Sequence, residues 1–186
     1  MGRKRQRPRN KKMNPTFFVF CEGETEEQYV KFLRSQYRIP IEIDSKITGQ
    51  KIDTGYIKRY KKDKPVHDKD KDFLLFDLDA GDILERLERI REATLLVSNP
   101  CFELWYMLHY EDQTAEIRCR DCRKRLLKMN KEYRRGVINP RLKSVLQENR
   151  EDAVRRAKGL RRFNNPSTTV YFLLEALEEV KKKKDR

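Results

Sequence analysis

The sequence predicts an α/β fold in which a mostly parallel sheet is flanked by helices, followed by a basic helical C-terminal region. Short apolar runs alternate along the chain with segments of helical periodicity, an order typical of βα units. The runs are apolar throughout instead of alternating with polar residues, which indicates strands covered on both faces. With 186 residues the chain has room for one such core and not for two.

The first predicted unit is a strand followed by a helix. The run TFFVFC at residues 16–21 is expected to form a buried strand, which Glu22 and Gly23 end. In residues 24–37 the apolar side chains recur on one helical face. Acids fill the first turn of this helix, where they meet the positive end of the helix dipole.

The next stretch has a weaker signal and ends in a second clear strand. Residues 40–43 suit a short strand, and the polar segment 44–72 holds one possible helix near residues 56–61. The run FLLF at residues 73–76 is apolar throughout and predicts a buried strand, which leads into the sequence DLDAGD.

Two helices and a third strand complete the predicted core. A helix with one apolar side is predicted over residues 82–92, and the run ATLLV at 93–97 predicts a buried strand. Asn99 and Pro100 suit the N-cap and the first position of a helix that reaches residue 110. This helix is apolar on nearly every side and is expected to be buried.

The last third of the chain is predicted to be helical and basic. A break at residues 164–168 precedes a final helix, which starts at Ser167 or Thr168 and docks its apolar face on the core. We divide the chain into a disordered basic tail at 1–15, a core at 16–111, a basic helical region at 112–163, a docking helix at 164–180 and a basic tail at 181–186.

The charge distribution indicates a polyanionic partner, nucleic acid above all. The net charge is +14, and residues 118–162 hold seventeen Lys and Arg against five acids. Aromatic residues are few there, which favours contacts to the phosphate backbone over base stacking. A basic surface also keeps small proteins soluble, and arginines can instead face acids on a partner. The candidate nucleic-acid contacts are Arg134, Arg135, Arg155, Arg156, Arg161 and Arg162.

The sequence predicts a cytoplasmic protein without a membrane segment. No run approaches the roughly 18 apolar residues that a membrane helix needs. No apolar segment typical of a signal peptide follows the basic N-terminus. Thiols of such a protein stay reduced, so its cysteines are not expected to form a disulfide framework.

The thiols and histidines offer an incomplete metal motif. Cys119-x-x-Cys122 is half of a zinc signature, and a full site needs two further ligands. Cys21 is expected to be packed at the end of its strand. His109 is expected to pack with the aromatic residues of its helix, with a place beside the active site as the alternative. The available further ligands are Cys21, Cys101, His67 and His109.

Three acids follow two of the predicted buried strands. Glu22 follows the first strand, and Asp77 and Asp79 follow FLLF. Ligands of parallel sheets bind at the carboxyl ends of strands, and neighbouring strands lie about 4.8 Å apart, so these carboxylates should meet. Carboxylates at such short distances repel one another unless a cation neutralises them, and oxygen ligands suit Mg²⁺ or Mn²⁺. We therefore expect a metal site with Glu22, Asp77 and Asp79 as ligands, Glu22 being alternatively a general base for phosphodiester hydrolysis.

Four motifs resemble a known family. The segments EG-x-TE and DxD, each after a strand, resemble the Toprim fold, a Rossmann-like fold of topoisomerases, bacterial primases and overcoming-lysogenization-defect nucleases. With SNPCFE-x-W-x-x-x-H and NPSTTVYFLLEAL, they make the chain similar to the RloB family, including AbiLii of an abortive-infection locus, over residues 16–177. The resemblance implies a Mg²⁺-dependent nuclease acting in anti-phage defence. It also implies a partner ATPase of the AAA or ABC type encoded nearby, with which an oligomer could form.

The resemblance extends the candidate site. By motif match, Glu22, Asp77 and Asp79 take the catalytic positions, and Glu26 and Glu103 are further candidate acids. Glu26 could equally serve the helix dipole. Glu103 lies on an otherwise apolar helix and requires a partner, which a metal or an arginine would supply.

Two other functions fit parts of the sequence. A phosphatase of the haloacid-dehalogenase type also places DxD after a strand, but its motif has Thr or Val where this chain has Gly81, and Glu22 would have no role. A non-catalytic adaptor would use the basic surface to bind nucleic acid or the ATPase. ATP hydrolysis itself is assigned to another chain, because the phosphate-binding motif G-x-x-x-x-G-K-[ST] does not occur in these 186 residues.

Overall fold

The computed structural model describes residues 14–37, 39, 42–49 and 51–184. The expectations for residues 1–13, for the start of the weak strand at residues 40 and 41, and for residues 185–186 lie outside this described part.

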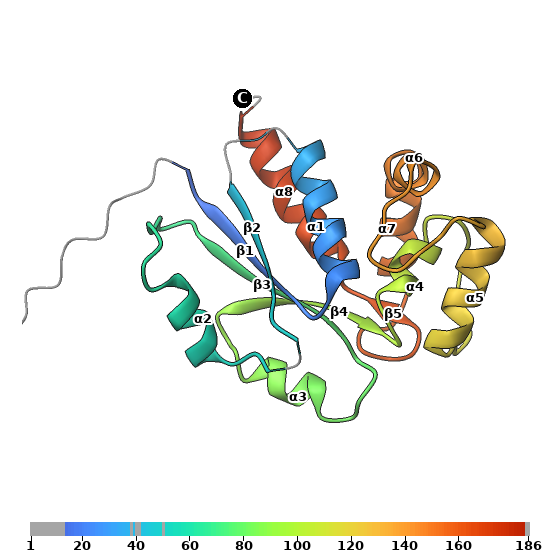
Figure 1. Ribbon diagram of the computed structural model, residues 1–186, viewed down its shortest axis with the longest axis horizontal. Coiled ribbons are helices and arrows are strands. Elements are labelled where there is room, and N and C mark those ends of the chain that lie inside the picture. The colour runs from blue at the N-terminus through green and yellow to red at the C-terminus, as the bar shows by residue number, and fades with distance from the viewer. Residues whose placement is uncertain (1–13, 38, 40–41, 50, 185–186) are drawn as a thin grey trace, which may run out of the picture.

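A five-stranded sheet in the order β2-β1-β3-β4-β5 forms the centre of the fold (Figure 1). β1, β2, β3 and β4 run parallel, and the short β5 pairs antiparallel with β4. This arrangement confirms the predicted α/β, Rossmann-like class with a mostly parallel sheet. The strands are β1 Thr16–Cys21, β2 Glu42–Ile47, β3 Lys71–Asp77, β4 Ala93–Asn99 and β5 Ser167–Thr168.

Helices cover both faces of the sheet and extend past its carboxyl edge. Figure 1 shows α1 and α8 on one face, α2 and α3 on the other, and α4 to α7 beyond the carboxyl ends of the parallel strands. Among the residues that the structure describes, no helix has the length and apolar character needed to cross a membrane. The helices are α1 Glu24–Gln36, α2 Thr54–Lys61, α3 Ile83–Glu88, α4 Glu103–Met107, α5 Cys119–Met129, α6 Pro140–Glu148, α7 Arg150–Lys158 and α8 Tyr171–Lys184.

The continuous apolar character of β1 follows from its position between two helical layers. Phe17 and Val19 belong to the core cluster that includes α1 and α8, whereas Phe18 and Phe20 belong to the cluster that includes α2 and α3. Successive side chains of a strand point to opposite faces, so both sets must be apolar. β3 divides its side chains between the two clusters in the same way.

β2 lies at one edge of the sheet, and its composition reflects this position. Ile43 is buried, but most of the strand is polar and at least partly exposed. Asp44 accepts a hydrogen bond from the Tyr60 hydroxyl at 2.9 Å and pairs with Lys64 at 2.7 Å. A charged edge strand is less open to pairing with another chain, and it also gives a weak strand signal in the sequence.

The end of β4 and the start of the C-terminal segment differ from the sequence-based expectation. Asn99 does not cap a helix: it is the last residue of β4, and its side-chain amide donates to the carbonyl of Phe163 at 2.9 Å. Ser167 and Thr168 form β5 instead of starting the final helix. β5 gives the edge of β4 a backbone partner, which a helix start would not provide.

Candidate active site

The site lies at the point where the strand order reverses. β1 is flanked by β2 on one side and β3 on the other, so the chain passes from β2 back across β1 to form β3. Ligands of open α/β sheets bind outside the carboxyl ends of the strands at such a switch point. Glu22 directly follows β1, and Asp77 is the last residue of β3.

Glu22 contacts the end of β3 through both its backbone and its side chain. The backbone N–H of Glu22 donates to the carbonyl of Leu75 at 3.0 Å, which extends the ladder between β1 and β3. Its carboxylate Oε2 accepts a hydrogen bond from the backbone N–H of Asp77 at 3.0 Å. The Glu22 carboxylate therefore contacts the Asp77 backbone, and a shared metal site for the carboxylates stays a prediction.

Asp77 connects the sheet to the loop before α4 and carries a strongly perturbed pKa. Its Oδ1 accepts from the backbone N–H of Phe102 at 2.7 Å. Burial raises the pKa of Asp77 to about 9, and the charges of Glu26, Glu103 and Glu22 add to this shift. Negative charge thus accumulates at the end of β3.

Glu26 is buried in the first turn of α1 and faces the same acids. It is 5% exposed, and its Oε2 accepts from the backbone N–H of the N-cap residue Gly23 at 3.1 Å. A Cβ atom at position 23 would lie 3.2 Å from this oxygen, so glycine permits the close approach. Burial raises the pKa of Glu26, and the charges of Glu103 and Glu22 contribute. Glu26 therefore closes the helix start and also belongs to the acid group.

Glu103 is paired with two arginines. It begins α4, is 1% exposed, and lies 2.9 Å from Arg123 Nε and 3.4 Å from Arg135 Nε. The sequence left two kinds of partner open for Glu103, a metal or an arginine. The structure gives it two arginines. Arg123 was not a sequence candidate, because its role depends on how α5 packs against α4 and not on a motif of its own.

Asp79 lies in the exposed turn after β3. The preceding Leu78 donates its N–H to the carbonyl of Ser98 at 2.8 Å, so the chain still follows β4 at that point. It then turns away, and Asp79 is exposed to solvent. A role for Asp79 as a metal ligand stays a prediction.

The six candidate arginines have different surroundings. Arg134 and Arg161 are exposed, whereas Arg155 pairs with Asp152 at 2.7 Å on the surface of α7. Arg162 lies over the ring of Phe172 at 4.7 Å.

Arg156 is held within the fold more tightly than the other arginines. Its side chain is 16% exposed, lies 2.9 Å from Asp112 and donates to the carbonyl of Leu108 at 2.8 Å. Arg135 reaches Glu103, as described above. Nucleic-acid binding by these residues stays a prediction.

His109 is a packed residue of the core. It is 1% exposed, its Nδ1 lies 2.9 Å from the carbonyl of Trp105, and its ring is T-shaped to the indole at 4.7 Å. Burial lowers the pKa of His109 to about 4. Cys21 is also packed, and its thiol contacts the carbonyl of Val19 at 3.8 Å. His67 lies in the polar connection between α2 and β3.

Comparisons with known proteins identify a family and no individual relative. The family model described as RloB-like protein matches residues 17–177. No curated protein and no solved structure gives a significant match.

Proposed function

Because the chain belongs to the RloB-like family, we propose that it is a Mg²⁺- or Mn²⁺-dependent nuclease with a Toprim-like active site. In this proposal it cleaves DNA or RNA as the effector of an anti-phage, abortive-infection system and acts with a partner ATPase. The supporting observation is the meeting of Glu22, Glu26 and Asp77 at the switch point of the sheet, where Asp77 has a pKa of about 9.

The donor set fits a hard divalent cation. Glu22, Glu26 and Asp77 offer only oxygen atoms, which Mg²⁺ and Mn²⁺ prefer. The raised pKa of Asp77 reflects burial and negative neighbours, and a cation would relieve both. Glu22 and Asp77 would hold the ion, and Asp79 could reach it from the exposed turn. When bound, the cation would activate water and stabilise charge on the phosphoryl oxygens and the leaving group.

The chain's own contacts hold the carboxylates on rigid elements. The Asp77 N–H orients Glu22, the Phe102 N–H orients Asp77, and the Gly23 N–H orients Glu26. Groups fixed in this way need little reorganisation during a reaction. In the proposed reaction Glu22 either completes the ligand set or accepts the proton of the attacking water.

The basic region supplies the attraction for a polyanionic substrate. Positive charge is concentrated on α5 to α7 and their connections, which lie beyond the carboxyl ends of the strands (Figure 1). Arg123 and Arg135 bring this charge to the acid group itself through Glu103. A substrate phosphate could therefore approach cations on one side and a metal held by carboxylates on the other.

A cleavage assay tests the proposal. The chain, alone and together with the ATPase encoded beside it, is incubated with Mg²⁺ or Mn²⁺ and a mixture of DNA and RNA. We expect cleavage by the parent and a loss of at least about 100-fold in Glu22→Gln and Asp77→Asn, typical of removing a catalytic acid or base. Asp72→Asn is the matched control: it alters an acid of the same strand β3, where Asp72 pairs with Lys61 at 2.8 Å.

The same samples separate the nuclease from an adaptor. Circular dichroism and nucleic-acid binding are measured on each variant, so that unfolding is not mistaken for loss of chemistry. Binding without cleavage under every metal, with equal affinity in the parent and both site variants, would refute the nuclease and support the adaptor.

A further inference from the structure

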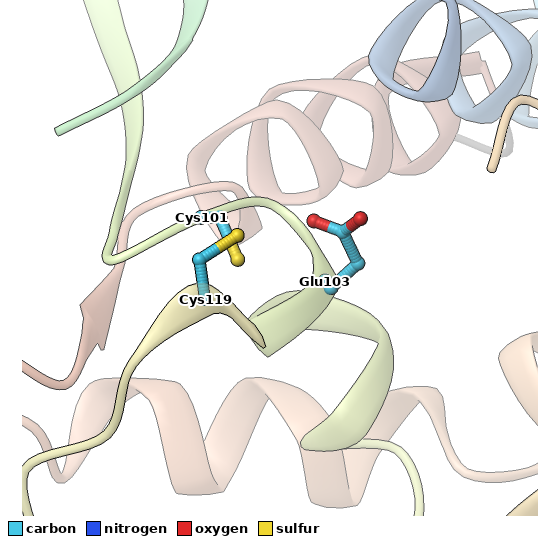
Figure 2. A group of neighbouring side chains, drawn as sticks. All are labelled: Cys101, Glu103 and Cys119. Atoms are coloured by element: carbon cyan, nitrogen blue, oxygen red, sulfur yellow. The ribbon is translucent and has the colours of Figure 1, made fainter. Parts of the chain in front are cut away.

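Three of the four cysteines converge at one place beside the acid group. Cys101 lies in the connection between β4 and α4, and Cys119 and Cys122 lie in the first turn of α5. The sulfurs of Cys101 and Cys119 and a carboxylate oxygen of Glu103 all lie within 4.8 Å of one another. Figure 2 shows the two sulfurs side by side, with Glu103 next to them at the start of α4.

Cys122, from the same turn of α5, lies beside Cys101 but is not one of the three ligand atoms that are all within 4.8 Å of one another. It is fully buried, and its thiol interacts with that of Cys101. The i, i+3 spacing places Cys119 and Cys122 on one side of the helix, facing the connection that carries Cys101. Segments about twenty residues apart thus bring their thiols to one point.

Apolar packing accounts for part of this cluster, because Cys101 and Cys122 belong to the same core cluster as Cys21 and Cys119 packs against it. Here the neighbours of the thiols include the carboxylate of Glu103, which is 1% exposed. Arg123 and Arg135 already compensate the charge of this carboxylate, and a metal ion would in addition give the thiols a partner.

The spacing suits a tetrahedral zinc ion. With Zn–S bonds of about 2.3 Å, two ligand atoms of a tetrahedron are separated by about 3.7 Å. The ligand atoms of Cys101, Cys119 and Glu103 lie within 4.8 Å of one another, so side-chain rotations that draw them together by about 1 Å would give these three donors tetrahedral spacing, and a rotation of Cys122 would have to add the fourth. Thiolates select zinc over magnesium, so this site and the carboxylate site would take different metals.

The surrounding charge is also appropriate. Three thiolates and one carboxylate around a divalent cation leave a net charge of about −2. Arg123 and Arg135, which pair with Glu103 at 2.9 Å and 3.4 Å, would balance that charge. They also give Glu103 the outer-shell contacts that metal ligands commonly have.

We propose that Cys101, Cys119 and Cys122, with the carboxylate of Glu103 as the fourth donor, form a structural Zn²⁺ site. The site would fasten the start of α5 to the connection after β4. Because the same connection gives its Phe102 N–H to Asp77, zinc would also hold the loop that orients this acid. The proposal does not depend on nuclease activity.

Metal analysis of the full chain tests the site directly. The protein is purified with a thiol reductant and without chelator, and zinc is measured by mass spectrometry. We expect about one zinc ion per chain in the parent and in Cys21→Ser, and loss of most of it in Cys101→Ser and Cys119→Ser. Asp77→Asn should keep its zinc, and excess Mg²⁺ should not displace it, which separates this site from the carboxylate site.

Cobalt substitution gives a spectroscopic readout of the ligands themselves, which a purely structural role of the thiols would not produce. The Co²⁺ form of the parent should show sulfur-to-cobalt charge-transfer bands and the intense visible bands of tetrahedral cobalt. Cys119→His, which keeps a zinc donor, should bind the metal with weaker charge-transfer bands.

Three results would overturn the proposal. These are a parent without zinc after purification and zinc addition, cobalt bands that persist unchanged in Cys119→Ser, and a Cys101–Cys119 disulfide in the freshly isolated protein in place of metal.

Discussion

Replacing Asp77 with asparagine should change how stability depends on pH. The asparagine side chain can still accept the hydrogen bond from Phe102 N–H, but it cannot ionise. In the parent, the folded-state pKa of Asp77 is about 9, well above its ordinary value of 3.8, so the folded state binds more protons than the unfolded state between these values. Because the folded state binds the extra proton, ionisation of Asp77 makes the parent lose stability as the pH rises from about 3.8 to about 9.

The magnitude comes from one proton. A single group contributes a slope of about 1.4 kcal/mol per pH unit, so from pH 6.5 to 8.5 the parent should lose roughly 2.7 kcal/mol relative to Asp77→Asn. This window lies above the region where His109 changes protonation, because the pKa of His109 is lowered from 6.5 to about 4. The other titrating groups are the same in the parent and in Asp77→Asn, so their contributions to the free energy of unfolding largely cancel when the two proteins are compared.

Urea unfolding at several pH values, in buffers free of Mg²⁺ and Mn²⁺, measures this difference. Asp72→Asn serves as the control and should give a curve offset from the parent but parallel to it. Adding Mn²⁺ at pH 8.5 should stabilise the parent, by about 2.7 kcal/mol at a concentration 100 times the dissociation constant, and should stabilise Asp77→Asn less. Parallel curves for the parent and Asp77→Asn would refute the assignment of a raised pKa to this carboxyl group.

Three further predictions concern the core and the basic region. In the parent, burying a neutral His109 should cost up to about 1.4 kcal/mol of stability per pH unit as the pH falls from 6.5 to 4. His109→Phe should reduce this loss, as measured by urea unfolding. An equal loss of stability in the parent and the variant over this pH range would contradict the prediction. Arg156→Met should lower the free energy of unfolding by about 1.5–3 kcal/mol, because its guanidinium donates to the C-cap carbonyl of α4, whereas the exposed Arg155→Met should leave the urea midpoint unchanged. If Arg134 and Arg161 contact phosphates, replacing both with alanine should reduce the slope of log K against log salt by about two, and an unaltered slope would exclude them.

The sequence predicted the strands that are covered on both faces better than the strands at the edges. β1 and β3 have unbroken apolar runs because helices cover both faces of the sheet. β2 carries a charged edge and gave a weak signal. β5 has two residues and exists only because β4 lies beside it, so no local pattern could indicate it.

The candidate site was predictable where topology alone decides the geometry. Glu22 and Asp77 end neighbouring parallel strands, which is sufficient to bring them together. The partners of Glu103 come from α5 and from the loop that follows it, and their approach depends on helix packing. The same packing brings Cys101 to Cys119, so the sequence could indicate only half of that cluster.

The chain leaves the sheet at Asn99 and re-enters it at Ser167, and these two residues face each other across β4 and β5. Residues 100–166 therefore form a segment whose two ends lie next to each other at the edge of the sheet. Changes to the exposed turns of this segment should be tolerated better than changes to its buried residues, because Phe102 and Trp105 pack in the same core as β1 and α1. Glu103 belongs to this segment, so a segment that replaced residues 100–166 would have to supply an acid at the same place.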